Sequence, residues 1–232
     1  MDAANAGPIL VVTGLQFEAD IAARGDTGVE VICRQNAGLA ALLETKLRQG
    51  CSGIVSFGTM GGLIDGLRPG DWVIAQALLD GAERIACDAV WSQALLRALP
   101  QAHYADIAGV AAPVASTEAK RALHTATGAA AVDMESQIVA RIAQAHALPF
   151  VCCRVVIDPV ERSLPHAALA GMREDGSVNV FAVLRSLFAR PGQLPALLAL
   201  ARDARIARRA LGLGRSEIGY KFGFERGFER QI

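Results

Sequence analysis

The chain has 232 residues, of which 52% are hydrophobic and 20% are charged. This supplies enough apolar side chain for a sizeable core and excludes an intrinsically disordered protein. The 23 basic and 23 acidic residues balance, which argues against a basic nucleic-acid-binding domain, so we expect no nucleic-acid partner. The charge is uneven, however: residues 183–232 hold ten Lys and Arg against four Asp and Glu. Such asymmetry is typical of a face that meets an anionic partner or a membrane.

Short apolar runs alternate with segments of helical spacing along most of the chain. In chain order we predict a strand at 9–13, a helix at 17–23, a strand at 29–33, a helix at 39–48, strands at 54–57 and 71–79, a helix at 89–98, a strand at 104–110, helices at 117–125 and 135–147, and a strand at 150–157. This alternation predicts one α/β domain with a mixed, largely parallel central β-sheet flanked by helices on both faces.

The C-terminal region differs in character from the rest of the chain. Helices are predicted at 179–189 and 194–211, with a break at Pro191 and Gly192 between them. We expect residues 1–211 to form the domain and residues 212–232, with the tandem GFERGFER, to form a separate tail.

The cysteines and the first residues of the chain bear on compartment and metal content. Five cysteines occur without a CxxC or Cys/His ligand spacing, which argues against a zinc site and predicts reduced thiols. The first residues have no basic segment and only a short apolar run, so they predict neither a signal peptide nor a membrane span. We therefore expect a cytoplasmic protein without a bound metal.

Two glycine-containing turns are the first candidates for chemistry. The third predicted strand ends within the segment SFGTMGG, in a glycine loop at 58–62, where Gly58 and Thr59 are expected to offer backbone N–H groups and a hydroxyl to an anion or a ribose. Gly14 ends the first strand at the same edge of the sheet, and Glu18 lies one turn into the following helix. The sequence leaves open whether SFGTMGG is only a tight turn and whether Glu18 faces the crevice or solvent.

Two carboxylates follow strands at this edge. The segment VDMES places Glu135 at the start of a helix, where the dipole favours a carboxylate that could also accept hydrogen bonds from the two hydroxyls of a ribose. The segment RVVIDP places Asp158 directly after a buried strand, in the crevice where open sheets bind ligands. Partial burial would raise the pKa of Asp158 and let it donate a proton near neutral pH. The structural alternatives, a helix cap for Glu135 and an Asp-Pro turn for Asp158, stay open.

Taken together, a first strand ending in glycine, SFGTMGGL, VDMES and RVVIDP, in this order and spacing, resemble the nucleoside phosphorylase and nucleosidase superfamily. The segments PFVCCRVVIDPVERSLP and RPGQLPALLALARDAR further resemble its hopanoid-associated phosphorylase branch, which acts on adenosylhopane, a nucleoside linked to a triterpenoid lipid. The likeness covers about residues 8–211. It implies a three-layer architecture and an enzyme that releases adenine by cleaving the N-glycosidic bond of a 5′-substituted adenosine, adenosylhopane in hopanoid biosynthesis.

The resemblance also implies roles for individual residues. Asp158 matches the acid that protonates N7 of the leaving adenine. Glu135 matches the carboxylate that binds the 2′- and 3′-hydroxyls of ribose, and Met134 packs against the sugar. Pro113 and Val114 fall where the family lines the pocket for the base.

The pocket for phosphate or water corresponds to the Gly14 loop, Gly58, Thr59 and Glu18. Nucleosidases of the family carry an acidic pair in the first loop, whose second member activates water, but Glu18 has no acidic residue directly after it. Many phosphorylases carry an arginine at the Glu18 position to hold phosphate. That arginine is also missing, and Arg34 is the nearest basic candidate. Phosphorolysis and hydrolysis therefore both stay open, and the missing water activator favours phosphorolysis.

The resemblance implies no metal and no organic cofactor, with inorganic phosphate as co-substrate if the enzyme is a phosphorylase. We expect a small-molecule or lipid nucleoside substrate, a homo-oligomer with a dimer favoured, and peripheral contact with the inner membrane face through the basic C-terminal region. The alternative for that region is a helix that packs its leucines on the sheet. Two other functions stay open: a hydrolytic 5′-methylthioadenosine/S-adenosylhomocysteine nucleosidase, and a non-catalytic nucleoside- or lipid-binding protein.

Overall fold

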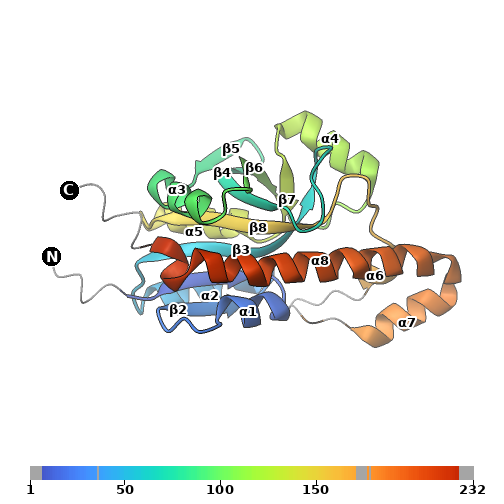
Figure 1. Ribbon diagram of the computed structural model, residues 1–232, viewed down its shortest axis with the longest axis horizontal. Coiled ribbons are helices and arrows are strands. Elements are labelled where there is room, and N and C mark those ends of the chain that lie inside the picture. Colours follow the sequence, from blue (N-terminus) through green and yellow to red (C-terminus); the bar gives the residue numbers. More distant parts are fainter. Residues whose placement is uncertain (1–6, 36, 171–176, 178, 225–232) are drawn as a thin grey trace.

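A computed structural model describes residues 7–35, 37–170, 177 and 179–224. These residues form an eight-stranded sheet with helices on both faces (Figure 1). The strands are β1 (Ile9–Thr13), β2 (Val29–Cys33), β3 (Gly53–Gly62), β4 (Trp72–Asp80), β5 (Glu83–Ala86), β6 (His103–Gly109), β7 (Ala131–Asp133) and β8 (Phe150–Asp158). The helices are α1 (Gln16–Ala22), α2 (Ala37–Leu47), α3 (Ala89–Ala98), α4 (Thr117–Thr127), α5 (Ser136–Ala145), α6 (His166–Ala170), α7 (Val180–Ala189) and α8 (Leu194–Ile218).

The sheet is mixed, which confirms the predicted fold class. Its strand order is β2-β1-β3-β7-β6-β4-β5, and β8 pairs with both β3 and β4. Strands β1, β2, β3 and β8 pair in parallel, whereas β7 pairs antiparallel with β3, and β8 antiparallel with β4. The parallel strands therefore bring their carboxyl ends to one edge, the place where α/β sheets bind ligands.

Apolar side chains cover both faces of the sheet and form two cores. Helices α2 and α5 pack on one face, where Leu43 and Val139 join Cys152 of β8. Helices α1, α3 and α8 pack on the other face, where Trp91 and Leu211 contact the strand residues whose side chains point to that face. Because successive strand side chains point to opposite faces, each central strand contributes to both cores. This is the three-layer arrangement that the resemblance implied.

Strand β3 continues to Gly62, whereas the sequence predicts a strand that ends at Phe57 and a glycine loop at 58–62. Strand β8 pairs with it from Ile54 to Gly61, with a register shift after Met60, and β7 pairs with its last two residues. Partners on both sides keep this glycine-rich segment extended, so its backbone polar groups serve the sheet as well as the site. The short strands β5 and β7 were also missed by the sequence analysis.

The C-terminal region packs on the domain beyond the predicted boundary at residue 211. Helix α8 continues to Ile218, and Phe222 after it is fully buried. The ring of Phe222 meets that of Phe57 edge-on at 5.1 Å, and its carbonyl accepts a hydrogen bond from Trp91 Nε1 at 2.8 Å. We therefore place no boundary at residue 211. The GFER repeat falls largely in residues 225–232, outside the described residues.

Candidate active site

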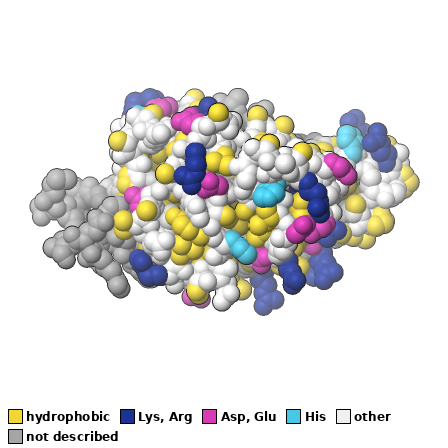
Figure 2. All heavy atoms as spheres, turned by 90° about the horizontal axis from the view of Figure 1, so that it is seen from above, with side chains coloured by type: hydrophobic (Ala, Val, Ile, Leu, Met, Phe, Trp, Pro, Cys, Tyr) yellow, Lys and Arg dark blue, Asp and Glu magenta, His cyan; other side chains and the backbone are white. Residues whose placement is uncertain are grey.

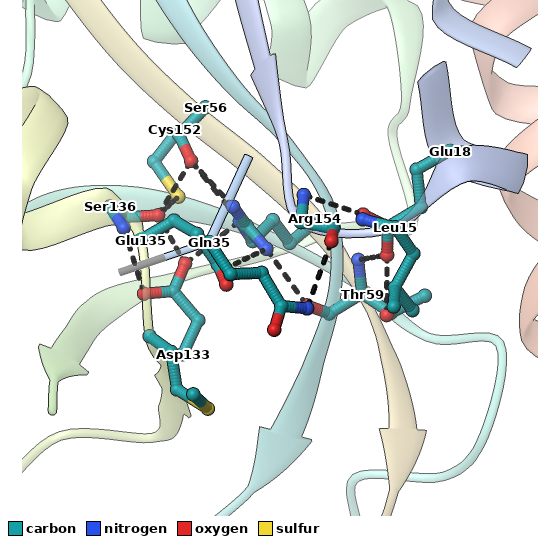
Figure 3. Close-up of polar contacts among 12 residues, drawn as sticks. Leu15, Glu18, Gln35, Ser56, Thr59, Asp133, Glu135, Ser136, Cys152 and Arg154 are labelled. Atoms are coloured by element: carbon teal, nitrogen blue, oxygen red, sulfur yellow. Dashed lines mark hydrogen bonds and ion pairs between the residues drawn. The ribbon is translucent and has the colours of Figure 1, made fainter. Parts of the chain in front are cut away.

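A buried arginine, Arg154 of β8, lies at the centre of the polar network at this edge of the sheet (Figure 3). Its Nε lies 2.8 Å from Asp133 Oδ2, and its Nη1 lies 3.2 Å from Glu135 Oε2. It also donates to the Thr59 carbonyl at 3.0 Å and, through Nη2, to Ser56 Oγ at 2.9 Å. A guanidinium is buried only when its donors have partners. The partners of Arg154 come from β3, β7 and the start of α5, so this side chain holds the three segments together.

The two carboxylates beside Arg154 have different tasks. Asp133 accepts hydrogen bonds from both the backbone N–H, at 3.1 Å, and the hydroxyl of Ser136, so it caps the first turn of α5. Glu135 stands at the N-cap position itself but makes no side-chain capping bond. Its carboxylate turns to Arg154 instead. The helix-cap alternative thus belongs to Asp133, and Glu135 is available to a ligand.

Glu18 faces the crevice, with 1% of its surface exposed. Its Oε2 accepts the backbone N–H groups of Gly14 at 3.1 Å and Leu15 at 3.0 Å. Its Oε1 accepts both the backbone N–H of Thr59 at 2.8 Å and the hydroxyl of that residue at 2.6 Å. Burial raises the pKa of Glu18, while Arg154 and the bonds from Thr59 oppose that rise.

Two glycines make room for these carboxylates. A Cβ atom on Gly14 would lie 2.9 Å from an oxygen of Glu135, inside van der Waals contact. A Cβ on Gly58 would overlap the carboxylate of Glu18, and Gly58 also has a positive φ of 150°. The space beside Gly14 is therefore taken by the carboxylate of Glu135, and the space beside Gly58 by that of Glu18.

The network holds three carboxylates around one guanidinium, so its charge is not balanced. Burial raises the pKa of Glu135 to about 7, with added repulsion from Asp133 and Glu18 and an opposing effect from Arg154. Glu135 therefore changes its protonation state near neutral pH, which is typical of functional sites.

Asp158 ends β8 in a second, separate charged group. Its Oδ2 lies 2.6 Å from Nζ of Lys120, a fully buried residue of α4. Lys120 also donates to the carbonyls of Pro159 at 2.9 Å and Arg162 at 3.0 Å, so it fixes the loop that follows β8. Burial raises the pKa of Asp158 to about 6, against the lowering effect of Lys120.

Strand β3 connects the two groups. Glu18 bonds to it at Thr59, and a Cβ on Gly61 would lie 3.3 Å from Asp158 Oδ2. At about 3.3 Å of rise per residue, the two contacts are about 7 Å apart along the strand. The arrangement thus places one buried acidic group beside each of two nearby points of β3.

The structure places the remaining predicted residues outside the hydrogen-bonded network of Arg154. Met134 is half-buried and lines a surface groove of about 460 Å³ between α2 and α5, together with Ala40, Ala111, Gln137, Ile138, Arg141 and Ile142. Val114 packs on Leu63 and Val132, and Pro113 is exposed. Arg34 is exposed beside Gly38 and is not brought into the network.

Three site residues were missed by the sequence analysis. Arg154 could have been found from the sequence, because a charged residue within an apolar strand is buried only when it has a partner of opposite charge. Lys120 looks like an ordinary helix residue, and its partner Asp158 lies 38 positions away. Gln35 follows β2 and donates to the carbonyl of Gly14 at 2.9 Å. Within the described residues, no group of three His, Cys, Asp or Glu side chains is placed to hold a metal ion.

The comparisons with known proteins define the class. Residues 8–189 match the family described as the phosphorylase superfamily, and the chain belongs to that superfamily. A search of curated proteins finds no match.

Solved structures share the fold at low sequence identity. The 5′-methylthioadenosine/S-adenosylhomocysteine nucleosidase of Helicobacter pylori, with 5′-methylthioadenosine in its active site, is similar with a TM-score of 0.64 and 15% identity over 92% of this chain and 100% of that one. The futalosine hydrolase of the same organism gives 0.62 and 16% over 91% and 98%. The S-adenosylhomocysteine nucleosidase of Streptococcus pyogenes gives 0.60 and 16% over 91% and 99%.

The charge imbalance predicts that Glu135→Gln stabilises the protein above neutral pH. The folded-state pKa of about 7 exceeds the ordinary 4.5, so the folded state binds more protons and wild-type stability falls as pH rises between these values. At pH 8 the variant should gain on the order of 1–3 kcal/mol in free energy of unfolding, and at pH 4 the gain should vanish. Urea unfolding at both values measures it.

The matched control is Asp133→Asn, which alters the other carboxylate on the same arginine. Asp133 is the closer partner of Arg154 and also caps α5, so this variant should lose stability at pH 8. A Glu135→Gln protein less stable than wild type at pH 8 would contradict the assigned charge imbalance.

Proposed function

We propose that this chain cleaves the N-glycosidic bond between adenine and ribose in a 5′-substituted adenosine. One observation carries the proposal: buried carboxyl groups with different electrostatic surroundings stand at two points along β3. Glu18 and Glu135 lie beside Arg154 at one point, and Asp158 lies beside Lys120 at the other. The separation of about 7 Å suits a nucleoside that lies along the strand, with its ribose toward Glu135 and its base toward Asp158.

Asp158 is proposed as the general acid. With a pKa of about 6, it keeps a protonated fraction near neutral pH and can deliver a proton to N7 of the leaving adenine. The base then departs neutral while the ribosyl group takes on oxocarbenium character. Lys120 holds one carboxyl oxygen and the neighbouring carbonyls, so it orients the acid without replacing it.

Glu135 is proposed to bind the ribose. Its carboxylate can accept hydrogen bonds from the 2′- and 3′-hydroxyls, and its charge stabilises the positive ribosyl group that develops as the bond breaks. Glu135 is only 5% exposed, and this burial strengthens the interaction relative to water. Met134 precedes it in the chain and would pack against the sugar.

The nucleophile is proposed to be water, activated by Glu18. This carboxylate already occupies the N–H groups of Gly14 and Leu15 and both donors of Thr59, which a phosphate ion would need. A phosphate would also add negative charge where three carboxylates face one guanidinium. The raised pKa of Glu18 makes it a stronger base for a water proton. Phosphorolysis, which the first loop of the sequence favours, would require Glu18 to release Thr59 and is the competing reaction.

The group on the 5′ carbon is proposed from sequence and from the structural neighbours. The segments that resemble the hopanoid-associated branch support adenosylhopane, which would place the reaction in hopanoid lipid biosynthesis. The similar structures are nucleosidases of 5′-methylthioadenosine and S-adenosylhomocysteine, which supports those compounds as the alternative. We propose adenosylhopane as the preferred substrate.

Product analysis tests the proposal. Purified protein is incubated with adenosylhopane or 5′-methylthioadenosine, with and without inorganic phosphate, and adenine and the ribosyl product are separated by chromatography. We expect adenine and a free ribosyl product without phosphate, with adenosylhopane cleaved faster. Glu18→Gln should lower the rate about 10²-fold or more, whereas Glu44→Gln, which alters a half-buried carboxylate of α2 that pairs with His146, should not. A strict phosphate requirement with a ribose 1-phosphate product would establish phosphorolysis, and no adenine from either substrate would overturn the function.

The acid assignment predicts a pH dependence. Because Asp158 must be protonated, kcat/KM should decline as pH rises above about 6. Glu135 and Glu18 must be ionised, and because the pKa of Glu135 is raised to about 7, kcat/KM should also decline as pH falls below about 7, which gives a narrow bell-shaped profile near neutral pH. Asp158→Asn should reduce kcat about 10²-fold or more with the fold intact, and should remove the alkaline decline. Asp106→Asn, which alters an ion pair with Arg84 elsewhere on the sheet, is the control. A kcat of Asp158→Asn close to wild type would disprove this role.

A further inference from the structure

Helix α7 and the first turns of α8 carry exposed apolar side chains that the proposed chemistry does not use. We call this surface the hairpin tip and define it by Phe181, Leu184, Phe188, Leu194 and Leu198. Phe181 is 77% exposed and Phe188 is 86% exposed, although phenylalanine is ordinarily a core residue. Figure 1 places the turn between these helices at one end of the molecule.

The apolar side chains of α7 form one stripe. Phe181, Leu184 and Phe188 are spaced by three and four residues, so they share one face of the helix. The contrast with the second half of α8 is informative, because Leu211 and Ile218 are buried against the sheet there. The alternative that the C-terminal leucines pack on the sheet thus holds for the second half of α8. No described residue covers the side chains of the hairpin tip.

Basic residues lie on α7 beside the hairpin tip and continue along α8 after it. Between residues 180 and 210 the chain has six arginines, and all of them are exposed: Arg185, Arg190, Arg202, Arg205, Arg208 and Arg209. The same stretch has one acidic residue, Asp203, which is buried and paired with Arg162 at 2.8 Å. Figure 2 shows hydrophobic and basic side chains intermixed at the end of the molecule where Figure 1 places the hairpin.

We propose that the hairpin tip docks on the surface of an anionic lipid bilayer. Phenylalanine and leucine side chains would enter the boundary between headgroups and acyl chains, while the arginines would meet lipid phosphates. A second copy of this chain fits less well, because two such surfaces would bring like charges together. No described helix is long and apolar enough to cross a membrane, so the proposed contact is peripheral. The proposal does not depend on the catalytic one.

Vesicle co-sedimentation tests the proposal. Full-length protein is mixed with vesicles of phosphatidylcholine alone or with about one third phosphatidylglycerol, at low and high salt. We expect binding to the anionic vesicles at low salt, and weaker binding at high salt because ions screen the arginines. The double variant Phe181→Ser/Phe188→Ser should lower the partition coefficient about tenfold for each phenylalanine. Arg185→Gln/Arg190→Gln should lower it on anionic vesicles only.

The matched control is Leu213→Ser, which removes an apolar side chain from the other half of α8 that is as exposed as Leu198 of the hairpin tip, at 62%. This variant should bind as wild type does, and all variants should keep the wild-type melting temperature. Wild-type protein that stays in the supernatant at low salt would overturn the proposal. An equal loss of binding in Leu213→Ser would also overturn it. Loss of a dimer in the phenylalanine variant, without vesicle binding by wild type, would assign the surface to a second copy instead.

Discussion

The burial of one guanidinium governs the organisation of the site. Arg154 lies inside the sheet with 1% exposure, where an uncompensated charge would be strongly destabilising. Asp133 and Glu135, from the β7–α5 junction, compensate the charge of Arg154, and oxygen atoms of β3 accept hydrogen bonds from it. The requirement also explains the neighbouring glycines, since the carboxylates can approach only where Gly14 and Gly58 carry no side chain.

The negative charge around Arg154 exceeds the one positive charge that it carries, and this surplus alters the proton affinity of the carboxylates. Three carboxylates share Arg154, so burial keeps the pKa of Glu135 near 7 and raises that of Glu18. A second pair, Lys120 and Asp158, lies near Gly61 and apart from Arg154. Burial raises the pKa of Asp158 there, and Lys120 lowers it. Because the two groups are separated along one strand, each keeps a pKa set by its own partners: burial and the neighbouring carboxylates raise that of Glu135, and burial raises that of Asp158.

The sequence predicts those parts of this arrangement that depend on local pattern. Apolar runs located the central strands, and the ends of two of them placed Gly14 and Asp158 at one edge of the sheet. Pairings between distant segments were not predictable: Lys120 meets Asp158 across 38 residues, and β3 stays extended through its glycines only because β7 and β8 flank it. The C-terminal packing also depends on a contact between distant segments, that of Phe222 with Phe57, and for that reason it was not predictable.

The central claim is that buried carboxylates in excess over Arg154 hold raised pKa values, and carbon-13 NMR titration of the glutamate side-chain carboxyls tests it most directly. In wild-type protein, the resonance assigned by the Glu135→Gln variant should titrate near pH 7. In Arg154→Met it should titrate at a still higher pH, because the guanidinium that favours the ionised form is gone. A Glu135 resonance that titrates near 4.5 in the wild type would contradict the account.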